Sequence, residues 1–216
     1  MRKIKNIDWQ NIEYQKAWNK QEEIFCAQIE KKKNRVATEN TLIFCEHPHV
    51  YTIGKSGNEG NMLVNDGSVP VLHTNRGGDI TYHGQGQIVG YPIFDLENLE
   101  VGLKEFIFKI EEAIVEVLKT YSIYGERLQG ATGVWLDADS VVKSRKICAI
   151  GVRSSRFVTM HGFALNVNTD LSYFNRINPC GFTNRGVTSM QKELGRVIDQ
   201  EIVKQQLFEA IKRNFL

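Results

Sequence analysis

The sequence predicts an α+β (α/β) fold in which a mixed β-sheet is flanked by helices. Strand-like segments outnumber helical ones, and the helical segments lie early, in the middle and at the end of the chain. The chain lacks the strict alternation of strand and helix that is typical of a doubly wound sheet. A length of 216 residues suits one domain, so we expect residues 1–216 to form a single domain.

The first half of the chain predicts one long helix followed by strands. An apolar stripe at helical spacing predicts a helix over 9–33. A loop rich in Gly and Asn is expected over 54–69. Short apolar runs predict strands over 41–45, 50–53, 69–74 and 88–95.

The second half predicts helices at both of its ends. Apolar residues at helical spacing predict a helix over 102–119, and a last helical region is expected over 188–214. Thr188 and Gln191 have the spacing of a capping box at its start. Between the helices, strands are predicted over 133–136, 146–153 and 157–167, followed by a loop over 175–187.

The composition excludes several classes of protein. Fractions of 42% hydrophobic and 24% charged residues are those of a soluble globular protein, and a net charge of +2 gives no reason to expect a nucleic-acid partner. No apolar run approaches the roughly 18–20 residues that span a bilayer, and no signal peptide is recognisable. Four scattered cysteines without a Cys-x-x-Cys pair suit reduced thiols, so we expect a cytoplasmic protein that does not act at a membrane.

A glycine-rich segment at 76–87 is the strongest candidate for a ligand site. Its twelve residues hold four glycines together with Arg76, Asp79 and His83. Glycine lets the backbone approach a ligand closely or adopt a positive φ. No Gly-Lys-Ser/Thr follows, and the segment does not open a helix as Gly-x-Gly-x-x-Gly does, so a nucleotide-phosphate site is not expected.

Cys180 and Lys146 are the candidates for covalent chemistry. Pro179 and Gly181 flank Cys180, which places the thiol in a turn, where either a nucleophile or a structural cysteine is possible. A thiol is only slightly ionised at neutral pH, so a nucleophilic cysteine needs a cation or another activating group nearby. Lys146 heads a strand and could supply that charge, or it could be an ordinary lysine at a sheet edge.

The remaining cysteines and histidines are assigned from their neighbours. Cys26 and Cys45 are expected in the core, and Cys148 is intermediate. His47 and His49 are separated by one Pro and have no matching acidic or Cys cluster, so no metal site is expected. His83 and His161 each precede a glycine and suit the orientation of a ligand.

Seven motifs occur in order over roughly residues 40–190. The segment 76–87 continues into Gly90-Tyr91-Pro92-Ile93 and is the most distinctive. The others are Glu46-His47-Pro48 with Tyr51-Thr52-x-Gly54, Thr132-Gly133-Val134-Trp135, Lys146-Ile147 with Ile150-Gly151-Val152-Arg153, His161-Gly162-Phe163-Ala164-Leu165-Asn166-Val167, Pro179-Cys180-Gly181 and Thr188-Ser189. Together they resemble the lipoyl(octanoyl) transferases, the octanoyl-[acyl-carrier-protein]:protein N-octanoyltransferases of lipoate biosynthesis. One residue departs from the pattern of that family: Gln85 stands where the family usually has Pro.

The resemblance implies the fold of the biotin and lipoate protein ligase catalytic domains. It implies transfer of an octanoyl group from octanoyl-acyl carrier protein to the acceptor lysine of lipoyl domains, without ATP or a metal. The acceptors would be the lipoyl domains of 2-oxoacid dehydrogenase complexes and the glycine cleavage H protein. An ATP-dependent lipoate or biotin protein ligase on the same fold is the alternative, and a non-catalytic acyl-binding module is a third.

The resemblance also implies roles for particular residues. Cys180 would be the acyl-thioester nucleophile, and Lys146 would lower the pKa of its thiol. The substrate-binding residues would be Arg76, Gly77, Gly78, Asp79, Ile80, Thr81, Tyr82, His83, Ala149, Ile150, Gly151, Gly162, Phe163 and Ala164.

Overall fold

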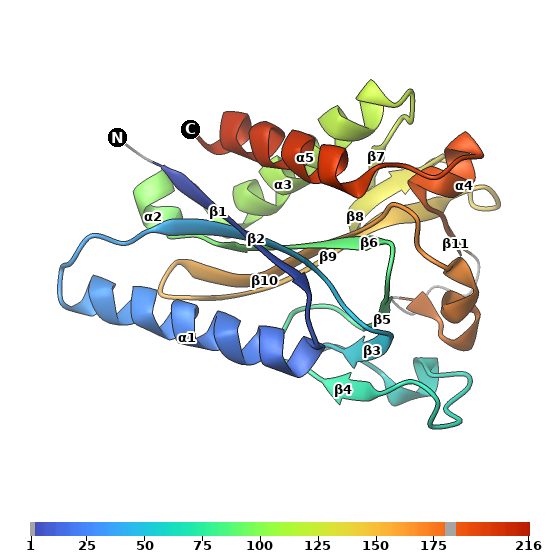
Figure 1. Cartoon of the computed structure of the whole chain (residues 1–216), viewed down its shortest axis with the longest axis horizontal. Helices are drawn as coiled ribbons and strands as arrows, with labels where there is room; N and C mark the ends of the chain where they lie inside the picture. The colour runs from blue at the N-terminus through green and yellow to red at the C-terminus, as the bar shows by residue number, and fades with distance from the viewer. Residues whose placement is uncertain (1–2, 180–184) are drawn as a thin grey trace.

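A large twisted sheet forms the centre of the molecule, as a computed structural model that describes residues 3–179 and 185–216 shows (Figure 1). The strands lie in the order β1-β2-β6-β10-β9-β8-β7, and β11 pairs with β9. The β1–β2 and β11–β9 pairs are parallel and the others are antiparallel, so the sheet is mixed as predicted. The bounds are β1 Ile4–Asn11, β2 Asn40–Glu46, β6 Gln87–Ile93, β7 Glu126–Leu128, β8 Ala131–Leu136, β9 Arg145–Ser155, β10 Val158–Asn166 and β11 Gly186–Val187.

A second, three-stranded sheet lies beside the first and has the order β4-β3-β5. Its strands are β3 Val50–Ile53, β4 Val71–His73 and β5 Ile80–His83. The glycine-rich segment 76–87 therefore contains β5 and the tight turn after it, and it ends at Gln87, the first residue of β6 in the large sheet. This connection places the segment over the large sheet.

Helices cover both faces of the large sheet (Figure 1). The long helix α1 lies on one face, and α3 and α5 lie on the other, in agreement with the predicted flanked sheet. The helices are α1 Tyr14–Lys33, α2 Leu96–Leu99, α3 Leu103–Thr120, α4 Met190–Leu194 and α5 Gln200–Phe215, with short 3-10 turns η1 Glu59–Asn61 and η2 Leu171–Arg176. Among the described residues, no helix has the length and apolar character needed to cross a bilayer.

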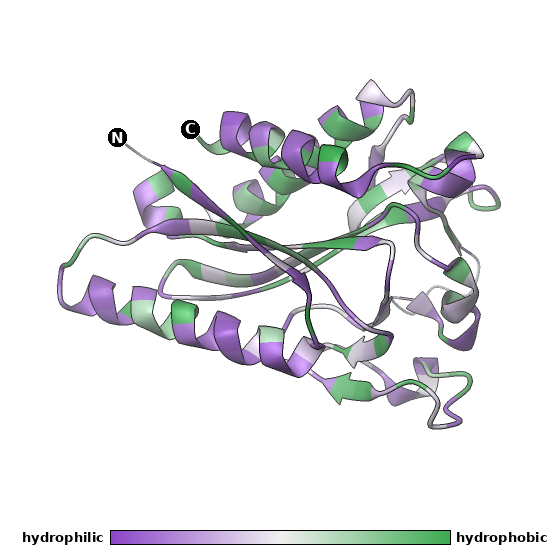
Figure 2. Ribbon diagram, viewed as in Figure 1, coloured by the Kyte–Doolittle hydropathy of each residue, from purple (hydrophilic) through white to green (hydrophobic). Residues whose placement is uncertain are grey.

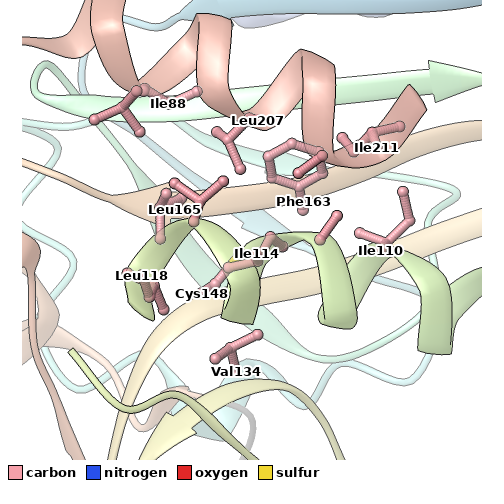
Figure 3. Close-up of a cluster of buried hydrophobic side chains, with 14 of the residues drawn as sticks. Ile88, Ile110, Ile114, Leu118, Val134, Cys148, Phe163, Leu165, Leu207 and Ile211 are labelled. Carbon is pink, nitrogen blue, oxygen red and sulfur yellow. The ribbon is translucent and has the colours of Figure 1, made fainter. Parts of the chain in front are cut away.

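The apolar core is divided between the two faces. Figure 3 shows side chains of α3 and α5 meeting those of the strands, for example Ile114 and Leu207 with Phe163. On the other face, Ala17 and Phe25 of α1 pack in a separate cluster with residues of β2, β6 and β10. Figure 2 shows hydrophilic and hydrophobic bands along α1 and α5, as expected of helices that bury one side only.

The prediction of a helix from residue 9 is wrong at its start. The chain first forms β1, which pairs in parallel with β2, and α1 begins at Tyr14. The carboxylate of Glu13 accepts hydrogen bonds from the N–H groups of Gln15 and Lys16 and so caps the helix. The strand was missed because β1 lies at the sheet edge and is mostly polar and exposed.

The prediction of one helical region over 188–214 is also wrong. Gly195 adopts a left-handed φ of 67° and ends α4, and α5 begins only at Gln200. The expected capping box does not form, because Ser189 is the N-cap residue and accepts from the N–H of Lys192 at 3.2 Å. Thr188 instead donates its hydroxyl to Glu193.

Candidate functional site

A cavity lies between the glycine-rich segment, strands β9 and β10, and the start of α1. It contains about 510 Å³ of empty space, part of which is open to solvent. Thirteen of the residues named from the sequence line it: Arg76, Gly78, Asp79, Ile80, Thr81, His83, Lys146, Ala149, Ile150, Gly151, Gly162, Phe163 and Ala164. Tyr14, Val89, Tyr91 and His161 line it as well.

Close backbone approaches explain the glycines at this cavity. A Cβ added at Gly162 would lie 2.1 Å from the carbonyl oxygen of Gly90 on the neighbouring strand. A Cβ at Gly151 would lie 2.7 Å from the carbonyl oxygen of Gly77. The N–H of Gly77 donates to the carbonyl of Val152 at 2.9 Å, so the glycine-rich segment is attached directly to β9. A side chain at Gly162 would separate β10 from β6, and one at Gly151 would push the glycine-rich segment away from β9.

Arg76 and Asp79 shape the glycine-rich segment from within. The buried Arg76 guanidinium donates to the carbonyl oxygens of Thr52, Gly77 and Asp79 at 2.7, 3.0 and 2.8 Å. The carboxylate of Asp79 accepts from the N–H of Ile80 at 2.7 Å and from the side chain of Asn61 at 2.6 Å. Both side chains therefore hold the backbone in the form that lines the cavity.

Gly77 and Tyr82 are the two proposed substrate-binding residues that do not line the cavity. The Tyr82 ring lies in an aromatic cluster of the small sheet, where it stacks on Tyr173 with centroids 4.9 Å apart. Its hydroxyl is 2.6 Å from Nδ1 of His49, and burial raises its pKa. Tyr82 thus supports β5 from the side away from the cavity.

His83 is a neutral histidine at the cavity wall. Its Nδ1 lies 2.8 Å from Oε1 of Gln87, whose Nε2 donates to Asn166, so Nδ1 carries the proton. Its ring stacks on Tyr14 with centroids 5.5 Å apart. Burial lowers the pKa of His83 to about 3, so it stays uncharged at neutral pH.

Lys146 reaches the cavity from β9. Its ammonium donates to the carbonyl of Thr132 at 3.2 Å and lies over the Trp135 ring. Lys146 also lines a second, smaller cavity together with Thr81, Ala149 and Pro179. Cys180 follows Pro179 in the chain but lies outside the described residues, so its predicted proximity to Lys146 stays a prediction.

The other thiols have different surroundings from one another. Cys45 and Cys148 are buried, and burial raises the pKa of each thiol. The expectation of a core position is confirmed for Cys45 and wrong for Cys26, which is exposed on α1. Cys26 follows the buried Phe25 directly, and because adjacent positions of a helix are about 100° apart it lies off the buried stripe of α1.

Two further histidines, His47 and His161, lie near the cavity but were not among the catalytic and substrate-binding residues that the resemblance implies. Nε2 of the buried His47 lies 2.7 Å from the Tyr91 hydroxyl, and Nδ1 lies 2.6 Å from the carbonyl of Ile12. His161 interrupts β10 with a positive φ of 58°, and its ring lines the cavity. The His161-Gly162 pair indicated from the sequence that His161 could orient a ligand, and its position at the cavity agrees with that prediction. Within residues 3–179 and 185–216, no group of three or more acidic, His or Cys side chains could hold a metal ion.

The chain is similar to one protein family over nearly its whole length. The lipoyl protein ligase A/B catalytic domain matches residues 13–212. A protein of Bacteroides fragilis strain YCH46 named octanoyltransferase is 55% identical over 205 residues, which cover 93% of this chain and 92% of that protein. Another of the same name, from Parabacteroides distasonis, is 53% identical, with 96% of each chain covered.

The fold is shared with more distant solved structures. A bi-partite lipoate protein ligase of Thermoplasma acidophilum has a TM-score of 0.72 at 13% identity, with 99% of this chain and 84% of that chain covered. A biotin protein ligase of Aquifex aeolicus has a TM-score of 0.54 at 12% identity, with 100% and 70% covered. These structures confirm the predicted ligase-like catalytic-domain fold.

Proposed function

Because the chain belongs to the lipoyl protein ligase A/B catalytic domain family, we propose that it is an octanoyltransferase of lipoate biosynthesis. It is an acyltransferase that moves an octanoyl group from an acyl donor to lipoyl-domain proteins. One observation supports this function most strongly. Relatives that are 46–55% identical to the chain, and are matched over most of it, are named octanoyltransferase. The ligases that share only its fold are far more distant, at 13% identity or below in the two cases compared above.

The proposed donor is octanoyl-acyl carrier protein. Its thioester is already activated, so the transfer needs neither ATP nor a metal. The proposed acceptors are the lipoyl domains of 2-oxoacid dehydrogenase complexes and the glycine cleavage H protein. The expectation of a cytoplasmic enzyme continues to rest on the scattered cysteines.

The proposed reaction has two steps through Cys180. Its thiolate attacks the thioester carbonyl, an S–C bond to Cys180 forms, and the C–S bond to the carrier breaks. The carrier sulfur takes a proton from the Lys146 ammonium and leaves as a thiol, which makes Lys146 neutral for the second step. The amine of the acceptor lysine then attacks this acyl-enzyme, an amide bond forms, and the Cys180 sulfur is released. Lys146 would stabilise the thiolate as an ammonium and take the proton of the incoming amine when neutral.

Three observations support Cys180 as the nucleophile. Pro179, to which Cys180 is bonded, lines the smaller cavity with Lys146, Thr81 and Ala149. Burial raises the thiol pKa of Cys45 and Cys148, which makes both poor nucleophiles. Cys26 is exposed but does not line either cavity.

The proposed slot for the acyl chain has the apolar character it needs. Ile80, Val89, Ile150, Phe163 and Ala164 line the cavity. Burial of a methylene is worth about 0.8 kcal/mol, so the six methylenes of an octanoyl chain contribute roughly 5 kcal/mol. Backbone N–H groups of the glycine-rich segment could stabilise the oxyanion that forms at the carbonyl.

The test is intact-mass analysis after the protein is mixed with octanoyl-acyl carrier protein. We expect one octanoyl adduct on the wild type and on Cys26→Ser, which removes the exposed thiol of α1. Cys180→Ser should form no thioester adduct and should not transfer octanoate at the wild-type rate. An adduct that persists in Cys180→Ser and disappears in Cys26→Ser would refute the assignment of the nucleophile.

A second arm distinguishes the ATP-dependent alternative. The enzyme is given ATP, free octanoate and an apo lipoyl domain, without acyl carrier protein. We expect no octanoylated lipoyl domain under these conditions. Formation of the product would show that the chain activates a free acid, as ligases do.

A further inference from the structure

His161 has a buried ring nitrogen for which the described residues offer no hydrogen-bond partner. Its side chain is 1% exposed and lines the large cavity, yet Nδ1 makes no hydrogen bond. A buried polar atom without a partner is costly, so such an atom usually faces a bound water or a ligand group. Of the two cavities described above, His161 lines the larger one.

The hydrogen bonds of His161 define what Nδ1 can do. Nε2 lies 2.6 Å from Oδ1 of Asn75, and Nδ2 of the same amide donates to the carboxylate of Glu22 at 2.9 Å. A carboxylate can only accept, so the Asn75 oxygen faces His161 and Nε2 carries the proton. Burial lowers the pKa of His161 to about 3 and keeps the ring neutral. Nδ1 is therefore an acceptor.

The backbone of His161 is held in an unusual conformation. Its φ of 58° lies in the left-handed region, which His adopts more readily than most residues with a Cβ. Oε1 of the buried Gln21 on α1 accepts from the His161 N–H at 3.0 Å. The ring is therefore fixed in place from both the backbone and Nε2.

His161 and Lys146 both line the cavity, from positions that are far apart along β10 and β9. On β10, His161 pairs with Val152 of β9, and Lys146 is six positions from Val152 along β9. At about 3.3 Å per residue, the Cα atoms of Lys146 and His161 are therefore roughly 20 Å apart. An extended eight-carbon chain spans about 9 Å, since its C–C bonds are about 1.5 Å long. The side chains of Lys146 and His161 occupy part of the remaining length.

We propose that His161 is a polar end wall of the acyl slot that limits the length of the acyl chain. This inference rests on the proposed function, in which the acyl carbonyl lies near Lys146 and the alkyl tail extends toward His161. Nδ1 holds a water at the end of the slot. An octanoyl chain leaves that water in place, whereas a longer chain displaces it and leaves Nδ1 buried without a partner.

The experiment compares octanoyl- and decanoyl-acyl carrier protein as donors. In His161→Leu the end wall becomes apolar, and we expect the decanoyl-to-octanoyl ratio of kcat/KM to rise about tenfold. His161→Asn keeps a polar acceptor and tolerates the left-handed backbone, so its ratio should stay near the wild-type value. His73→Leu makes the same exchange at an exposed position of β4, outside the cavity, and is the matched control.

The outcomes separate the end wall from the proposed function. If folded His161→Leu has the same decanoyl-to-octanoyl ratio of kcat/KM as the wild type, the assignment of His161 as the end wall is wrong. A large rise of this kcat/KM ratio in His161→Asn would show that the space at the end of the slot, and not its polarity, limits the length of the acyl chain. That result would also overturn the proposal, even if His161→Leu failed to fold. If the wild type transfers neither chain, the proposed function has failed instead.

Discussion

The ammonium of Lys146 lies 4.6 Å from the centroid of the Trp135 ring. An aromatic face attracts a cation, and an ammonium group is what would stabilise a thiolate. The Trp135 indole N–H donates to the carbonyl of Ala131 at 2.9 Å, so the ring itself is held in β8. This contact connects the motif Thr132–Trp135 with the motif that starts at Lys146.

We expect Lys146→Met to lower octanoyl transfer by about 100-fold or more, the usual contribution of a general acid–base group. The pH profile for alkylation of Cys180 should also move to higher pH, because the cation is lost. Lys143→Met removes a nearby exposed lysine and should change neither property. An unchanged alkylation profile in Lys146→Met would remove Lys146 from the mechanism.

We expect Arg76→Lys to loosen the glycine-rich segment. Arg76 donates to three backbone carbonyls through its planar guanidinium, and a lysine ammonium cannot reach all of them. The free energy of unfolding in urea should fall by about 2 kcal/mol, and KM for the acyl donor should rise. Arg213→Lys, at an exposed position of α5, should stay within about 0.5 kcal/mol of the wild type. Equal stability of the two variants would contradict the assigned role of Arg76.

Gly162→Ala should disrupt the contact between β6 and β10. The new Cβ would lie 2.1 Å from the backbone oxygen of Gly90, which cannot rotate away. We expect loss of stability by several kcal/mol or failure to fold, measured by thermal unfolding. Gly102→Ala is the control, because nothing lies within 4 Å of its added Cβ. Similar midpoints for the two variants would show that β6 and β10 can separate without penalty.

The buried histidines make stability depend on pH. Burial lowers the pKa values of His47, His83 and His161 to about 4, 3 and 3, below the value of about 6.5 in the unfolded chain. Their contribution is complete above about pH 6.5 and decreases as the pH falls toward the folded values, because the unfolded state then binds more protons. Each histidine contributes a slope of up to about 1.4 kcal/mol per pH unit. Urea unfolding at pH 7.5 and 5 should show a smaller pH dependence for His83→Gln than for the wild type, and an equal dependence would refute this account.

Gln85 occupies a turn position that proline also suits. The N–H of Gln87 donates to the carbonyl of Gly84 at 3.3 Å, and Gly86 has a φ of 80°. These are features of a type II turn, in which proline is favoured at the second position. Gln85→Pro, the residue usual in the resembling family, should stabilise the fold by about 0.4–1 kcal/mol by restricting the unfolded chain. Destabilisation in thermal unfolding would mean that Gln85 has another backbone conformation.

Much of the fold follows from local sequence pattern. The strands at 41–45 and 50–53 and the helix at 102–119 were predicted within a residue or two, because each is an apolar run or stripe of its own. The edge strand β1 and the break at Gly195 were missed. A polar edge strand is specified by its partner β2, and the local helical spacing over 188–214 continues across the break.

The sequence by itself determined which segments matter, through the ordered motifs around residues 76–87, Lys146 and Cys180. Only the tertiary structure decided where the side chains of residues 76–87 lie and what they contact. Arg76 holds backbone carbonyls, and Tyr82 faces away from the cavity. His161 joins the wall because Gln21 and Asn75, which lie far from it in the chain, fix its backbone and ring. Contacts of this kind depend on how α1 and the two sheets pack, and no local pattern of residues encodes them.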